Sequence, residues 1–278
     1  MIDPGPYTRA QLKLQGIETK QLTELVAQGR LRRVSRGWYA DAFSPEAAIR
    51  AVQLGGRLGC LSACKVHGIW VPDSTDVHVV INPGVRLPAQ TPKGVQFHRI
   101  SEPCLSAVAP LEASIAHVLH RHDEETGLVV LESAVNMKRL HVADARGLLA
   151  DWSIRGARTG QHFSALAQSG SETRLRLFFQ RLRVPVQPQA LVAGVGHVDL
   201  LVGRSWIIEA DSERHHSSPS NVAIDRERDL TARELGYIRD RLSYEQIWLR
   251  WQRTQSWLTT MLRTRRHLKS PNPPGSRA

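Results

Sequence analysis

Carboxylates interrupt two apolar segments in the C-terminal third of the chain, and this pattern constrains the fold most strongly. Residues 197–202 read His-Val-Asp-Leu-Leu-Val and, after a Gly-Arg-Ser turn, residues 206–211 read Trp-Ile-Ile-Glu-Ala-Asp. The alternation predicts two β-strands, with Glu209 and Asp211 on one face of the second. Asp199 stands alone among apolar residues, where an unpaired charge is costly. Three or four carboxylates brought together repel one another, so we predict that they need a cation, and oxygen-only ligands favour Mg²⁺ or Mn²⁺.

Predicted helices flank these strands. The first begins after Ser169 and carries Glu172, followed by an apolar face. Because Glu172 lies three residues after Ser169, closing a capping box is an alternative to a role in catalysis. The second covers residues 221–235 and ends at Gly236, and its charges are equally compatible with a salt-bridged helix face. Those charged residues are Asp225, Arg226, Arg228 and Asp229.

Several motifs occur in a fixed order between residues 172 and 248. They are the helix glutamate, the Val-Asp-Leu strand, Ile-Glu-x-Asp, a histidine five residues beyond that aspartate, Asp-Arg-x-Arg-Asp and Ser-Tyr-Glu-Gln-Ile. In this order they resemble the restriction-endonuclease-like domains related to the very-short-patch-repair (Vsr) endonuclease, within the PD-(D/E)xK nuclease superfamily. The resemblance implies a mixed central sheet flanked by helices and metal-dependent cleavage of phosphodiester bonds.

The resemblance also implies residue roles. Asp199 and Glu209 hold the metal ion, Glu172 supports them from the helix, and His216 acts as a general base or phosphate contact. Arg226 and Arg228 orient the DNA backbone or pin the acidic cluster. The sequence departs from the superfamily pattern at three places. Asp211 stands where a lysine is more usual, Ser212 replaces a glycine, and residues 238–241 read Ile-Arg-Asp-Arg where an apolar strand is usual.

Residues 7–40 combine two short helices with a basic hairpin. Thr8 and Gln11 have capping-box spacing, Gly16 and Gly29 end the predicted helices, and residues 30–40 read Arg-Leu-Arg-Arg-Val-Ser-Arg-Gly-Trp-Tyr-Ala. This is the pattern of a winged helix-turn-helix. It resembles the N-terminal domain of the AbiEi-type antitoxin family, which implies DNA binding. The residues predicted to face the groove are Lys20, Gln21 and Glu24, and those predicted to contact phosphates are Arg32, Arg33 and Arg36.

The alternative for this segment is a solvated basic hairpin on a module that binds protein. Residues 43–152 follow as an α+β scaffold whose layout also resembles the AbiEi-like family. Three further boundaries complete the predicted organisation: the winged helix takes residues 1–42, a Gly-, Ser- and Arg-rich linker takes 153–170, and the endonuclease-like domain takes 171–252. Residues 253–278 are predicted to be a basic, partly disordered tail.

Cysteine and histidine suggest two other metal sites, and both are weak. Cys60 and Cys64, with His67 nearby, lie in an apolar stretch without a fourth ligand in sight, which favours buried helix cysteines. His120 and His122 are two residues apart, so on a helix they converge poorly on one ion and a solvated helix end is favoured. Three cysteines also favour a reducing cytoplasm.

The charge of the chain bears on its partners. Its 278 residues carry a formal net charge of +11, which is typical of proteins that bind nucleic acid or an anionic surface. No apolar run is long enough to span a bilayer, and the N-terminus shows no signal-peptide pattern. We therefore expect a cytoplasmic, nucleoid-associated protein of the α+β class that binds duplex DNA. A homodimer and a cognate toxin or defence partner are further candidate assemblies.

The leading hypothesis for function is a Mg²⁺-dependent DNA endonuclease targeted by its winged helix, in defence or a toxin–antitoxin context. The alternative is a non-catalytic DNA-binding regulator, an AbiEi-like antitoxin with a degenerate nuclease domain. A nuclease acting on RNA is a weaker third hypothesis, because no aromatic stacking platform stands out in the sequence.

Overall fold

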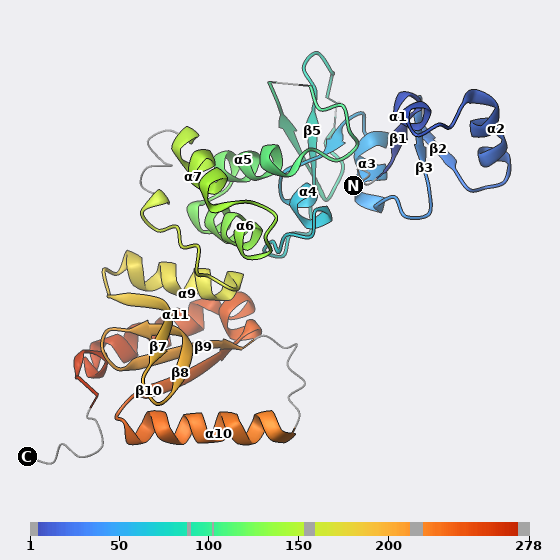
Figure 1. Cartoon of the computed structure of the whole chain (residues 1–278). Coiled ribbons are helices and arrows are strands. Elements are labelled where there is room, and N and C mark those ends of the chain that lie inside the picture. The colour runs from blue at the N-terminus through green and yellow to red at the C-terminus, as the bar shows by residue number, and fades with distance from the viewer. Residues whose placement is uncertain (1–4, 88–89, 102, 153–158, 212–218, 272–278) are drawn as a thin grey trace, which may run out of the picture. The chain divides into compact units, whose positions relative to one another are not determined.

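The chain folds as two compact units, Met1–Gly160 and Gln161–Ala278 (Figure 1). The computed structural model describes residues 5–87, 90–101, 103–152, 159–211 and 219–271, and for residues 219–224 it describes the backbone alone. The division between the units falls inside the segment 153–170 that the composition marks as a linker. Helices and small sheets occur in both units, which confirms the predicted α+β class.

The first unit begins with the winged-helix pattern. Thr8 caps the first helix through a capping box with Gln11, as predicted, and Gly16 ends that segment with a φ of 84°. Leu12, Leu22 and Leu31 form the small core. The three strands pair antiparallel in the order β1-β3-β2, so an N-terminal strand completes the wing. The elements are β1 (Tyr7–Thr8), α1 (Arg9–Leu14), α2 (Thr19–Ala27), β2 (Arg32–Ser35) and β3 (Trp38–Ala40).

The rest of the first unit is a second small sheet with helices. Its strands have the order β4-β5-β6, with β4 antiparallel and β6 parallel to β5. Leu58 lies in β4 opposite Val79, and α4 begins two residues later. The elements are α3 (Glu46–Gln53), β4 (Arg57–Leu58), α4 (Cys60–Val66), β5 (Val77–Ile81), β6 (Val95–Arg99), α5 (Leu111–Arg121), α6 (Glu124–Asn136) and α7 (Val142–Asp151).

The second unit contains a four-stranded mixed sheet of order β10-β9-β8-β7. The strands β7, β8 and β9 are antiparallel neighbours, and β10 lies parallel to β9 after the crossover through α10. The elements are α9 (Gly170–Arg181), β7 (Val186–Val192), β8 (Gly196–Val202), β9 (Trp206–Asp211), α10 (Pro219–Glu234), β10 (Ile238–Ser243), a π-helical turn (Glu245–Leu249) and α11 (Trp251–Arg263).

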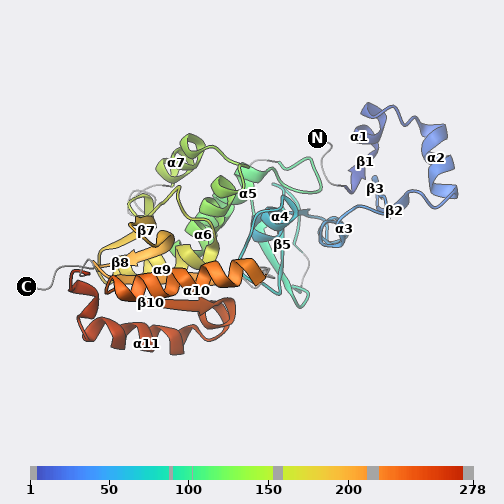
Figure 2. The same ribbon diagram turned by 60° about the horizontal axis from the view of Figure 1, so that its bottom comes forward.

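Helices cover both faces of this sheet. On one face, Phe179 of α9 and Leu258 of α11 pack with Trp206, and on the other Ala232 of α10 packs against Ile207. Figure 2 shows α10 and α11 on either side of β10. The predicted mixed sheet flanked by helices is therefore present.

The helix α11 belongs to this core. Leu258 is fully buried, and Thr254 donates a hydrogen bond of 2.7 Å to the carbonyl of Gln246. The predicted boundary at residue 253 thus falls inside a helix, because α11 has an apolar face that the basic composition of the segment conceals. Within the predicted tail, residues 272–278 lie outside the described residues.

Candidate functional site: a carboxylate cluster and an exposed basic wing

Three carboxylates converge from a helix and two strands of the second unit. Glu172 lies in the first turn of α9, Asp199 in β8 and Glu209 in β9. Gln189 of β7 links two of them, because its Nε2 donates to Oε2 of Glu172 at 2.9 Å and lies 3.4 Å from Oδ1 of Asp199. The backbone N–H of Asp199 donates to Oε2 of Glu209 at 3.1 Å. The structure therefore brings together three of the five residues that the sequence predicts for the site, and the other two are Asp211 and His216.

The strands separate at this point in the sheet. The ladder between β8 and β9 runs from Leu200 opposite Ile208 to Val202 opposite Trp206. Beyond it, the N–H of Ala210 donates to Oδ2 of Asp199 at 2.8 Å instead of to a strand carbonyl. The carboxylates thus take over backbone hydrogen bonds that a regular ladder would use, which fixes their positions.

Burial controls the electrostatics of the cluster. Burial raises the pKa of Glu172, which is only 4% exposed, although the N–H of Gln168 at 3.0 Å opposes the shift. Burial, followed by the charges of Glu172 and Glu209, raises the pKa of Asp199 to about 7. Like charges in a poorly solvated site disfavour ionisation, and a bound cation would relieve that repulsion.

A buried arginine, which the sequence analysis missed, already neutralises one of the carboxylates. Arg239 of β10 donates from NH2 to Oε1 of Glu209 at 3.1 Å and from NH1 to Oδ1 of Asp229. The side chains of Arg239 and Glu209 are 5% and 13% exposed. Arg241 follows on the same face and pairs with Asp225 and Asp229. The charged segment 238–241 is therefore a sheet strand whose cations meet acids of α10 and β9.

The other candidate residues of this unit have different surroundings. Asp211 is exposed at the end of β9, and Arg226 is exposed on α10. Arg228 donates to the carbonyls of Val195 at 2.9 Å and His197 at 2.5 Å, so its guanidinium holds the turn between β7 and β8. Arg226 and Arg228 were predicted either to orient the DNA backbone or to pin the acidic cluster, and Arg239 is the arginine that pairs with an acid of the cluster. His216 lies outside the described residues.

Glu172 takes part in capping α9, which is the alternative that its spacing from Ser169 predicted, and its role in catalysis stays a prediction. The hydroxyl of Ser169 accepts from the N–H of Glu172 at 3.2 Å and donates to its Oε1 at 3.0 Å, which caps α9. The other carboxylate oxygen faces Gln189, as described. Capping therefore explains why Glu172 is held at the helix start, and it leaves one oxygen directed at the cluster.

The donor chemistry fits a hard divalent cation. Asp199 and Glu209 offer carboxylate oxygens, each with lone pairs beyond the hydrogen bonds they accept. Within the described part of the chain, the three carboxylates do not form a group with all ligand atoms within 4.8 Å of one another. Gln189 bridges Glu172 and Asp199, and Arg239 binds Glu209. A metal ion would therefore have two protein ligands, Asp199 and Glu209, and water would supply the rest.

The basic wing presents the predicted DNA contacts to solvent. Arg32, Arg33 and Arg36 are all exposed, and Arg32 pairs with Glu46 at 3.3 Å, with side chains 59% and 81% exposed. An ion pair so exposed is worth little, so a phosphate can replace the carboxylate. Lys20, Gln21 and Glu24 are exposed on α2, whose buried side carries Leu22.

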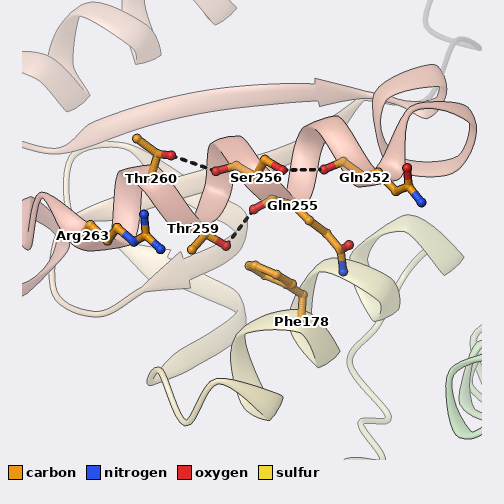
Figure 3. Close-up of a pocket in the computed structure, with 7 residues that line it drawn as sticks. All are labelled: Phe178, Gln252, Gln255, Ser256, Thr259, Thr260 and Arg263. Atoms are coloured by element: carbon orange, nitrogen blue, oxygen red, sulfur yellow. Dashed lines mark hydrogen bonds between the residues drawn. The ribbon is translucent and has the colours of Figure 1, made fainter.

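A hollow of about 600 Å³ lies along α11 and is separate from the carboxylates (Figure 3). Phe178 of α9 and Arg263 line it, together with hydroxyl and amide side chains of α11. The hydroxyls of Ser256 and Thr259 donate to carbonyls one turn earlier in their own helix. These hydroxyls are thus satisfied within α11, and none of the three carboxylates lines the hollow.

Residues 8–40 match the family described as a transcriptional regulator, AbiEi antitoxin. The match covers the capping box, both helices and the wing, which confirms the resemblance of the N-terminal segment and makes it an AbiEi-like DNA-binding domain. No match to a curated protein is found. Among the described helices, none is both long and apolar enough to cross a membrane.

Proposed function

We propose that the protein binds duplex DNA through its winged helix and hydrolyses phosphodiester bonds at the carboxylate cluster with Mg²⁺ or Mn²⁺. The observation that carries the proposal is the convergence of Glu172, Asp199 and Glu209 in a poorly solvated site that raises the pKa of Asp199. Such a site favours a cation, and perturbed carboxyls of this kind gather at functional sites. The AbiEi-like match and the exposed arginines of the wing support DNA as the substrate.

Asp199 and Glu209 would hold the ion, which when bound lowers the pKa of a water and neutralises charge on a phosphate. Arg239 positions Glu209 by holding Oε1. Gln189 holds Glu172 beside Asp199, and it does so from a backbone with a φ of 49°, an unusual conformation for a residue other than glycine.

A regulator without nuclease activity is the second candidate, and one observation favours it. Arg239 and Gln189 already supply donors to the carboxylates, so the cluster is held together without a metal ion. In that case the C-terminal unit would serve the DNA-binding domain as a structural partner, in a toxin–antitoxin context.

Cleavage of supercoiled plasmid separates the two candidates. The full-length protein is incubated with Mg²⁺, Mn²⁺ or chelator beside Asp199→Asn, Glu209→Gln and the control Asp225→Asn, whose carboxylate is 41% exposed on α10. Binding to the same DNA is measured in parallel. We expect metal-dependent nicking by the wild type and the control, and its loss with binding retained in the two site variants. Tight binding with no cutting under any metal refutes the nuclease and supports the regulator.

A further inference from the structure

A cysteine and three histidines from distant parts of the sequence meet in the first unit. The Sγ of Cys60 lies 3.2 Å from Nε2 of His122, and Nδ1 of His78 lies 2.9 Å from Nε2 of His98. Cys60, His78 and His98 each offer a ligand atom, and these three atoms all lie within 4.8 Å of one another. His122 approaches the same group, because its ring centroid is 5.2 Å from that of His78.

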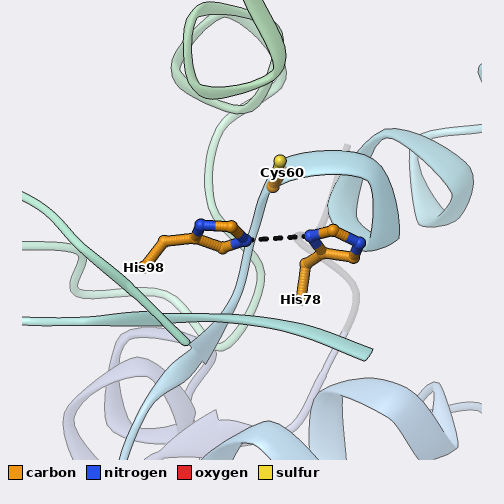
Figure 4. A group of neighbouring side chains, drawn as sticks. All are labelled: Cys60, His78 and His98. Atoms are coloured by element: carbon orange, nitrogen blue, oxygen red, sulfur yellow. Dashed lines mark hydrogen bonds between the residues drawn. The ribbon is translucent and has the colours of Figure 1, made fainter. Parts of the chain in front are cut away.

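The four residues come from four separate segments. Cys60 begins α4, His78 lies in β5, His98 lies in the parallel neighbour β6, and His122 follows α5. The register sets His98 beside the strand of His78, since Val80 is the partner of His98 across the ladder. In Figure 4, Cys60 lies over the line that joins the two imidazoles. The sheet and the start of α4 thus direct one thiol and two imidazoles at a common point, and the end of α5 places the third imidazole, that of His122, beside the thiol.

The cluster is shielded from solvent and has unsatisfied polar atoms. Cys60 and His78 are 0% and 1% exposed, and His98 and His122 are half-buried. The Nε2 atom of His78 is buried with no hydrogen-bond partner among the described residues.

The backbone at Cys60 is strained in support of this arrangement. Cys60 has a φ of 51°, in the left-handed region that residues other than glycine rarely adopt. The preceding Gly59 packs so closely on Val80 that a Cβ there would lie 2.3 Å from a methyl carbon. Such strain gathers at functional positions. Here it aims the thiol at the histidines.

We propose that Cys60, His78, His98 and His122 form a Zn²⁺ site. One sulfur and three nitrogens match the ligand types and the number of a tetrahedral zinc centre. With zinc–nitrogen bonds of about 2.0–2.1 Å and a zinc–sulfur bond of about 2.3 Å, a tetrahedral centre has nitrogen–nitrogen edges of about 3.3 Å and sulfur–nitrogen edges of about 3.6 Å. The His78–His98 nitrogens at 2.9 Å and the Cys60–His122 pair at 3.2 Å are each about 0.4 Å shorter, so a small outward movement would admit the ion. On binding, the thiol loses its proton to solvent and the thiolate sulfur bonds to zinc, so the charges balance.

The ion would join the start of α4, both parallel strands and the end of α5. All four coordination positions belong to the protein, which is the closed arrangement of a structural site. The alternative is a hydrogen-bonded cluster without metal, in which a His78–His98 hydrogen bond and a Cys60–His122 contact suffice. That alternative gives no reason for the left-handed backbone at Cys60.

The test uses the untagged full-length protein under reducing conditions, because a histidine tag would itself bind zinc. Metal content after exposure to Zn²⁺ and gel filtration is measured by mass spectrometry. Metal-free protein is then titrated with Co²⁺, whose visible bands report tetrahedral geometry and whose near-ultraviolet charge-transfer band reports a thiolate ligand. Cys60→Ser and His98→Ala are compared with two controls, His120→Ala, exposed on α5, and Cys104→Ser, a cysteine outside the cluster.

We expect one zinc ion per chain in the wild type and both controls, and a thiolate–cobalt band in each. Each site variant should weaken binding by more than about 10–100-fold, the loss that follows removal of an outer-shell partner alone. If a site variant does not fold, the cobalt spectrum of the wild type decides. Absence of tetrahedral and thiolate bands in the wild type overturns the proposal, and so does full zinc occupancy in folded Cys60→Ser and His98→Ala.

Discussion

Replacing Asp199 with asparagine is expected to stabilise the metal-free protein at pH 8 and to leave its stability at pH 4 nearly unchanged. Burial, and then Glu172 and Glu209, raises the pKa of Asp199 from its ordinary 3.8 to about 7. At a pH between these two pKa values, the carboxyl of Asp199 is therefore protonated in the folded state and ionised in the unfolded state. Stability then falls as the pH rises from about 4 to about 7 and is level above that range.

The magnitude follows from the difference between the two pKa values. At 1.36 kcal/mol per unit of pKa difference, the rise from 3.8 to about 7 corresponds to about 4 kcal/mol of destabilisation above pH 7. Glu172 titrates together with Asp199, so part of the pH dependence belongs to the pair. The amide oxygen of asparagine can still accept the N–H of Ala210. We therefore expect Asp199→Asn to be more stable than the wild type at pH 8 by about 2–4 kcal/mol.

Urea unfolding in the presence of chelator at pH 4.5, 6 and 8 measures this difference. Two transitions are fitted, because the chain folds as two compact units. Asp211→Asn, at an exposed position on the same strand, is the control and should stay within about 0.5 kcal/mol of the wild type. Added Mg²⁺ should stabilise the wild type and not the Asp199 variant. A wild type whose stability does not fall between pH 4.5 and 8, or a less stable variant at pH 8, refutes the reasoning.

Three further outcomes are expected. Arg239→Met leaves two carboxylates without their buried cation and should destabilise by about 3–5 kcal/mol in urea unfolding, whereas the more exposed Arg241→Met should cost under about 1 kcal/mol. Leu258→Ala should cost about 2–5 kcal/mol and the exposed Leu249→Ala very little, and equal effects would show that α11 is not part of the core. Arg33→Ala should weaken binding to duplex DNA and reduce the salt dependence by about 0.9 in the log–log slope, and an unchanged slope in fluorescence anisotropy would exclude a phosphate contact.

The N-terminal winged helix could be predicted from the sequence because its signals are local. The capping box of Thr8 and Gln11 and the helix-ending glycines Gly16 and Gly29 lie within a few residues of the features they control. The pairing of β1 with β3 could not be predicted in this way, because a strand of two residues is too short to show an alternation of polar and apolar side chains. That pairing depends on the wing already being formed.

The carboxylate cluster was predictable in part. Asp199 and Glu209 interrupt apolar strands, and that anomaly is visible in the sequence. Gln189 and Arg239 give no such signal, because their contacts depend on the antiparallel register of β7 and on β10 lying parallel to β9 after a whole helix. Whether the cluster hydrolyses DNA stays a prediction, as does each residue's catalytic role.

The cysteine–histidine cluster shows a second limit. Its members are separated by 18, 20 and 24 residues, so no short metal-binding motif links Cys60, His78, His98 and His122. The neighbours that sequence reasoning considered for Cys60 were Cys64 and His67, and His67 instead contacts the carbonyl of Ala109 at 2.8 Å. Only the pairing of β5 with β6 and the docking of α5 bring the true neighbours together.

The pairing of Arg239 with Glu209 has a consequence for how this site can evolve. Because the arginine neutralises Glu209 whether or not a metal binds, selection for a stable fold alone would preserve both residues. Asp199 is different, since its charge lowers the stability of the folded protein at neutral pH. A lineage that needs only the fold and the winged helix would gain stability by replacing Asp199, and a lineage that needs the chemistry would keep it. The identity of the residue at this one position would then distinguish descendants that use the site from those that have abandoned it.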